Sequence, residues 1–140
     1  MAIKRALTLT ILLLLFLEGC GSPRDKATKE IKTIQSWAAA ARMTAEAYVA
    51  GAAPKPYASD TMAATAQALE KEMSAIQSSI PDEPRAHIAA QTESLRRQVE
   101  ETKAAIDASD RARVQQQMGQ LSSVEDALAQ ILKGYGDTTR

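Results

Sequence analysis

The sequence predicts an all-α protein, folded as an antiparallel up-down-up-down four-helix bundle. Alanine, glutamine, glutamate and lysine dominate the composition, and runs of β-branched residues are absent. Four segments repeat apolar residues at alternating steps of three and four, which is the pattern of a helix with one buried face. Short breaks separate the four segments, and helices of similar length with short connections favour this topology.

The first helix is expected over residues 25–52. Asp25 suits its first turn, where a carboxylate faces the positive end of the helix dipole. Gly51 weakens its last turn, and Pro54 and Pro56 prevent it from continuing, which predicts a loop over residues 53–56. The expected buried positions are mostly alanine, so that a neighbouring helix can approach closely. They are Ile31, Ile34, Ala38, Ala41, Ala45, Tyr48 and Ala52.

The second helix is expected to start near Ser59 or Asp60, either of which can cap it, and to end before Pro81. Its apolar positions are Met62, Ala66, Leu69, Met73, Ile76 and Ile80. Residues 81–84 form the second break, in which Asp82 is a possible cap and Pro84 suits a first helical turn.

The third helix carries its apolar stripe on Ile88, Thr92, Leu95, Val99, Thr102 and Ile106. Its opposite face is charged. On that face Arg97 stands four residues from both Glu93 and Glu101, a spacing that predicts solvated ion pairs.

Residues 107–110 contain three good capping residues, which predicts a tight turn before the fourth helix. The alternative is one helix from Pro84 to Lys133, which would be about 75 Å long and would need a partner along its whole length. The fourth stripe consists of Val114, Met118, Leu121, Val124, Leu128, Ile131 and Leu132. Gly134 is the expected stop, and residues 135–140 are expected to form a flexible tail.

The N-terminal stretch has the features of an export signal. Lys4 and Arg5 precede an apolar run over residues 6–17, which is shorter than the roughly 20 residues of a membrane-spanning helix. The single cysteine of the chain, Cys20, follows directly. The sequence Leu17-Glu18-Gly19-Cys20 resembles the lipobox of bacterial lipoproteins.

That resemblance implies cleavage between Gly19 and Cys20 and acylation of Cys20, for example with palmitate. The chain then divides into a signal peptide (1–19), a lipidated tether (20–24), the bundle (25–134) and the tail (135–140). In enteric lipoproteins an aspartate after the cysteine marks inner-membrane retention. Gly21 stands there instead, which implies an outer-membrane protein facing the periplasm. The alternatives are an uncleaved signal anchor and a buried structural cysteine.

Composition and motifs speak against several functions. Charge is balanced at 17 basic and 17 acidic residues, so nucleic acid is not an expected partner. His87 is the only histidine and no Glu-x-x-His pair occurs, so neither a metal nor another cofactor is expected. The neighbouring acid pairs fall on polar faces and helix starts, where solvated charge is the ordinary explanation. They are Glu70/Glu72, Asp82/Glu83, Glu100/Glu101 and Glu125/Asp126.

Trp37 lies at the edge of the first stripe. It is either peripheral core or an aromatic contact for a protein partner. The leading hypothesis is therefore a membrane-anchored envelope lipoprotein whose bundle is a non-catalytic interaction module with a protein partner. The alternative is a periplasmic binding protein that holds a small apolar ligand in the bundle core among methionine-containing helices, and an enzyme is a distant third.

Overall fold

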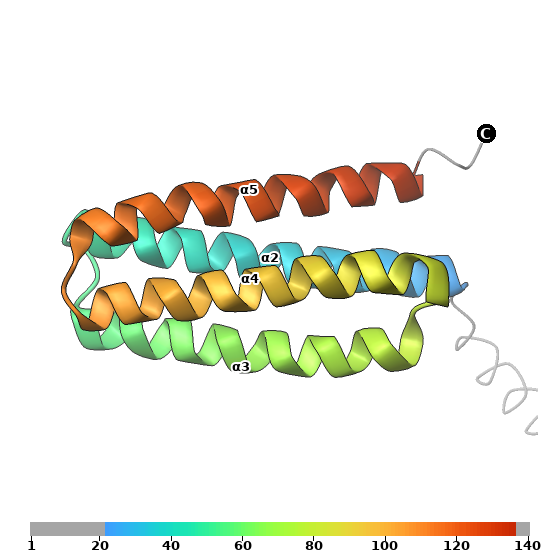
Figure 1. Ribbon diagram of the computed structural model, residues 1–140, viewed down its shortest axis with the longest axis horizontal. Helices are drawn as coiled ribbons and strands as arrows, with labels where there is room; N and C mark the ends of the chain where they lie inside the picture. The colour runs from blue at the N-terminus through green and yellow to red at the C-terminus, as the bar shows by residue number, and fades with distance from the viewer. Residues whose placement is uncertain (1–21, 137–140) are drawn as a thin grey trace, which may run out of the picture.

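The computed structural model describes residues 22–136, and these form four long helices joined by three short connections. The helices are α2 (Pro23–Val49), α3 (Lys55–Ser79), α4 (Asp82–Asp107) and α5 (Arg111–Gly136). They run alternately up and down, with the α2–α3 and α4–α5 connections at one end and the α3–α4 connection at the other (Figure 1). The predicted antiparallel four-helix bundle is confirmed.

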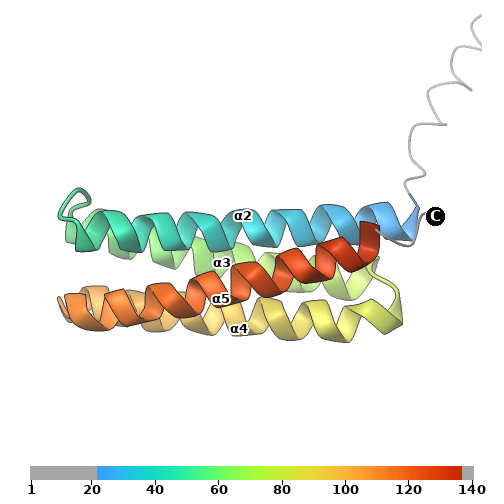
Figure 2. The same cartoon turned by 90° about the horizontal axis from the view of Figure 1, so that it is seen from above.

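Each helix packs against its neighbours in the sequence, and α5 closes the bundle against α2. Seen from above, α2 and α5 lie over α3 and α4 (Figure 2). Helices α2 and α4 also make contact across the diagonal. This contact follows from the sequence, because the small alanine side chains of α2 leave room for the larger core residues of α4.

The core is a continuous cluster that contains the apolar stripe of every helix. Its largest fully enclosed side chains include Ile31, Leu69, Leu95, Leu121 and Leu128. Threonines replace apolar residues at a few core positions. Their hydroxyls donate to the carbonyl four residues earlier, as Thr92 does to Ile88 at 2.8 Å and Thr102 to Gln98 at 2.7 Å. These buried hydroxyls therefore cost little, since each has a partner.

The first helix begins and ends within three residues of its predicted bounds. Ser22 caps it, because the Asp25 backbone N–H donates to the Ser22 hydroxyl while the Asp25 carboxylate accepts from the Ser22 backbone N–H. It ends at Val49 rather than residue 52. Gly51 adopts a φ of 75°, and the hydrogen bonds from Gly51 to Tyr48 and from Ala52 to Ala47 complete a Schellman motif.

The predicted starts of the second and third helices are wrong. A proline prevents a preceding helix from continuing, but it can also stand in the first turn of the next helix. Helix α3 starts at Lys55 instead of Ser59 or Asp60, since Pro56 falls in its first turn, where no N–H is needed. Pro54 takes the capping position, and the loop is confined to residues 50–54. Helix α4 starts at Asp82, so Asp82 is its first residue and not its cap.

The turn predicted at residues 107–110 is present and separates α4 from α5, which excludes the single long helix. Ser109 adopts a φ of 58°, and Asp110 accepts from the Arg113 backbone N–H at 3.0 Å through its carboxylate. At the other end, α5 continues through Gly134 to Gly136. A glycine ends a helix only where the backbone turns left-handed, and Gly134 does not do so. Tyr135, expected in the tail, belongs to the last turn of α5 and packs against the core.

Candidate functional site

The described residues form a pocket of about 830 Å³ at one end of the bundle, which we call the end pocket. It lies where α2 starts, α4 starts and α5 ends, at the right of Figure 1. Its apolar wall consists of Pro23, Ala27, Pro81, Pro84, Ile131 and Tyr135. Ser22, Arg24, Glu83, His87, Gln130 and Gly134 complete it.

Local hydrogen bonds fix the segments that form the end pocket. The capping box of Ser22 and Asp25 sets the direction in which the chain enters α2. Across the pocket, the Arg85 guanidinium donates to the Ile80 carbonyl from Nε at 2.8 Å and pairs with Asp82 at 2.8 Å. This bond closes the α3–α4 connection over Pro81. The pocket walls are therefore held by bonds within each connection.

One contact links the first turn of α2 to the last turn of α5. Arg24 donates from Nε to the Tyr135 carbonyl at 2.8 Å, and its Nη2 donates to the same oxygen. This bond occupies a helix C-terminal carbonyl, where a cation also suits the negative end of the helix dipole. It holds the two rims of the pocket together.

Tyr135 has an altered acidity in this setting. Burial raises the pKa of its phenol, and the negative charge of Glu83 raises the pKa further, while Arg24 opposes the shift. The phenol is therefore neutral at physiological pH and is a hydrogen-bond donor rather than a nucleophile. His87 lies exposed on the same rim, six residues into α4.

The acid pairs noted in the sequence lie apart from this pocket or only at its edge. Glu100 pairs with Arg96 at 2.5 Å, and Glu125 pairs with Arg42 at 3.0 Å. Glu83 is exposed at the pocket rim. Within residues 22–136, no three histidine, cysteine or acidic side chains gather as metal ligands would.

Trp37 is half-buried and packs against the core. Its indole Nε1 is enclosed and has no hydrogen-bond partner among the described residues. A buried indole N–H usually has a hydrogen-bond partner, so the unpaired N–H of Trp37 lowers the stability of the fold. The packing favours the peripheral-core interpretation, and the role as a partner contact stays a prediction.

The methionines do not gather in one ligand site. Met62 is fully buried, Met73 and Met118 are packed at the core edge, and Met43 is 61 % exposed on the outer face of α2. None of them lines the end pocket. A ligand site among methionine-containing helices therefore stays a prediction, and the end pocket is formed by other residues.

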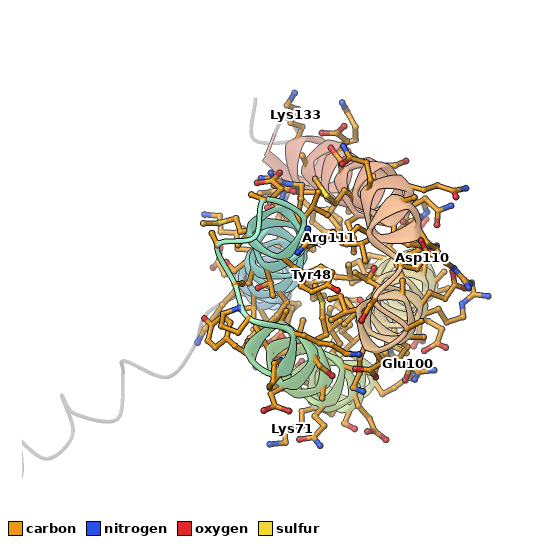
Figure 3. The ribbon with its side chains drawn as sticks, turned by 90° about the vertical axis from the view of Figure 1, so that its left-hand side faces the viewer. Tyr48, Lys71, Glu100, Asp110, Arg111 and Lys133 are labelled. Carbon is orange, nitrogen blue, oxygen red and sulfur yellow. The ribbon has the colours of Figure 1, made fainter. Side chains whose placement is uncertain are left out.

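The opposite end of the bundle is closed by polar contacts. The Arg111 guanidinium lies 5.7 Å from the centre of the Tyr48 ring. Figure 3 shows both residues at this end of the bundle. Ser59 donates to the Asp107 carboxylate at 2.6 Å and Lys55 to the Ser109 hydroxyl at 3.1 Å. These bonds join the two connections at that end.

The predicted cleavage and lipidation residues, Gly19 and Cys20, lie outside the described residues. The first described residue, Ser22, lines the end pocket. The spacing of residues in the sequence does not predict this site, because its walls come from segments more than a hundred residues apart. Pro81 and Pro84 both line the pocket and lie close together in the sequence, but their pattern predicts only a break between helices.

Comparison of the chain with family models, with curated proteins and with solved structures finds no match in any of the three. Among residues 22–136, no helix is both long and apolar enough to cross a bilayer.

Proposed function

We propose that the protein is a lipid-anchored lipoprotein of the bacterial envelope, whose helical bundle is a non-catalytic interaction module for a protein partner. The anchor is the acylated Cys20, and the location is the outer membrane facing the periplasm. The observation that carries the binding role is the end pocket, which has a largely apolar wall and lies at the end of the bundle where the chain comes from Cys20.

The sequence supports the anchoring part of this proposal. A positive start, an apolar run and the Leu17-Glu18-Gly19-Cys20 motif follow one another in the order of a lipoprotein signal. Acyl chains contribute about 0.8 kcal/mol for each buried CH₂ group, so two or three chains hold a protein firmly on a membrane. The bundle needs no membrane-spanning helix of its own for this role.

The test of anchoring is metabolic labelling with a clickable fatty acid. The wild-type protein is expected to take up the label, and Cys20→Ser is expected to abolish labelling and to leave an unprocessed precursor, because the acylated thiol is gone. Glu100→Gln is the control, since Glu100 is an exposed side chain of α4 far along the chain from the signal. A wild-type protein that stays unlabelled and keeps a free Cys20 thiol contradicts the proposal.

The second candidate function is binding of a small apolar ligand, and the end pocket also favours it. Ligand sites are commonly pockets of about 300–1,000 Å³ with mostly apolar walls. Native mass spectrometry of the protein extracted from its own envelope distinguishes the two functions. A retained small molecule in addition to the acyl groups on Cys20 supports ligand binding.

A further inference from the structure

We propose that the end pocket binds a fatty acyl chain, and that this chain belongs to the lipid on Cys20 of the same molecule. The inference rests on the proposed function, because it requires Cys20 to be acylated. It assigns an occupant to the pocket and gives the anchor a second contact with the bundle.

The attachment point of the lipid is close to the pocket. Ser22 lines the pocket, and Cys20 precedes it by two residues, which span at most about 7 Å when extended. The capping box holds Ser22 in place, since its backbone N–H lies 3.0 Å from the Asp25 carboxylate and its hydroxyl 2.8 Å from the same oxygen. A lipid on Cys20 is therefore attached within about 7 Å of a residue that lines the pocket.

The walls of the pocket suit a hydrocarbon chain. Ala27 is fully buried at its inner side, and Pro23, Pro84 and Ile131 add apolar surface. The guanidinium of Arg24, one of the charged residues that line the pocket, donates to the Tyr135 carbonyl. A chain of methylene groups makes no hydrogen bonds, so it leaves these polar contacts intact while it covers the apolar wall.

Attachment to the same molecule favours this chain over any free one. A group tethered to the protein has an effective concentration of about millimolar at a site within its reach. We assign the pocket to the anchor's own acyl chain because its attachment point lies two residues from Ser22, which lines the pocket. Free fatty acids and the chains of membrane lipids are the competing occupants, and the Cys20→Ser variant tests them.

Gly134 offers a way to fill the pocket without harming the fold. It lines the pocket, and a Cβ built on it meets no atom within 4 Å. Gly134→Leu adds an apolar side chain to the wall, and it replaces a glycine inside a helix, which stabilises α5. Gly119 in the same helix also has no atom within 4 Å of its built Cβ and lies outside the pocket, so Gly119→Leu is the matched control.

The experiment uses the full chain, processed and acylated in its own membrane. Cells are fed a palmitate analogue with a diazirine in mid-chain and a terminal alkyne, and isolated membranes are irradiated. Cross-linked peptides are then mapped by mass spectrometry. In the wild type and in Gly119→Leu, the acyl group on Cys20 is expected to cross-link to Ile131, Tyr135 or Pro84 of its own chain. In Gly134→Leu that yield is expected to fall about tenfold, which corresponds to about 1.4 kcal/mol.

Two results overturn the proposal. In the first, Cys20 is acylated but cross-links only to membrane lipids, or equally in both glycine variants. In the second, the free analogue cross-links in the pocket of Cys20→Ser while the wild type shows no link within its own chain, so that the pocket takes an external chain. Absence of any acyl group on Cys20 removes the proposed function as well, and the labelling experiment reports that result separately.

Discussion

Two residues in the connections adopt a left-handed backbone, and only one of them is glycine. Gly51 has a φ of 75° after α2, and Ser109 has a φ of 58° after α4. Both occupy the same place in a Schellman motif, as the bonds from Gly51 to Tyr48 and from Ser109 to Ile106 show. A side chain in this conformation costs about 1–2 kcal/mol, and a glycine costs about 0.5–1 kcal/mol of entropy instead.

We therefore expect substitutions at these two positions to change the free energy of unfolding in opposite directions. Ser109→Gly should raise the free energy of unfolding by about 0.5–1 kcal/mol, and Gly51→Ala should lower it by a similar amount. The hydrogen bond from Lys55 to the Ser109 hydroxyl is exposed and reduces the gain only slightly. Urea unfolding followed by circular dichroism measures both, and a destabilised Ser109→Gly protein contradicts the account of this turn.

The charged face of α4 shows how far residue-level pairing follows spacing. Spacing alone predicted ion pairs of Arg97. In the structure Arg96 forms them, to Glu93 at 2.8 Å and to Glu100 at 2.5 Å. Both arginines have acidic residues three and four positions away, so spacing alone does not distinguish them. They differ in exposure, because Arg96 is half-buried and Arg97 is exposed. The Arg96 guanidinium, as hydrogen-bond donor to Glu93, lowers the pKa of that carboxyl.

One contact between α2 and α3, that of Glu30 with Glu72, is unfavourable at neutral pH. Glu30 of α2 and Glu72 of α3 lie within hydrogen-bonding reach of each other. Burial raises the pKa of Glu30 above its ordinary value of 4.5, and the hydrogen bond and charge of Glu72 raise it further, while Lys29 opposes the shift. A raised carboxyl pKa means that folding favours the protonated form. The stability from this contact is present below about pH 4.5 and is lost as the pH rises through the raised pKa.

Glu30→Gln should therefore stabilise the bundle at neutral pH. The amide keeps an uncharged hydrogen-bonding group at the contact, so the melting temperature of the variant relative to wild type should increase as the pH rises from about 4 to about 7. The control is Asp126→Asn, which changes an exposed acid with no ion pair among the described residues. Thermal melts at several pH values measure the difference, and an effect with no pH trend contradicts the contact.

The elements of the fold could be predicted from the sequence to a large extent, because helical periodicity depends on local spacing. The stripes of α2, α3, α4 and α5 form the core as expected, except for Ala52, which is exposed because α2 ends at Val49. The boundaries could be predicted less well. Pro56 both prevents one helix and starts the next, and Gly134 has the residue type of a stop without its backbone conformation. Which of its roles a proline or glycine takes depends on tertiary packing, and the sequence pattern of a single segment does not predict that packing.

At the scale of the whole molecule, the end pocket arises only from the assembled bundle. Its walls combine the starts of α2 and α4 with the end of α5. The topology brings these three helix ends together, because antiparallel helices of nearly equal length place alternate ends side by side (Figure 1). The order of the helices could be predicted from the sequence, but the shape of their shared end could not, since it depends on side chains far apart in the chain.

The same topology relates the pocket to the proposed anchor. The helices that start at this end include the one that follows Cys20, so the end pocket lies at the end of the bundle nearest the proposed anchor. Under the proposed anchoring at Cys20, the end pocket lies at the anchored end of the bundle, and the end that carries Arg111 and Tyr48 lies opposite it. The central claim is therefore that the protein begins at an acylated Cys20.

The most direct test of that claim is the intact mass of the protein purified from its own membranes. The account predicts a species whose N-terminal residue is Cys20 and which carries the added mass of a diacylglyceryl group, usually with a further acyl group on the new amine. Fragmentation should place the added mass on Cys20. A mass equal to the unmodified chain, or a species that still contains residues 1–19 with a free Cys20 thiol, would contradict it.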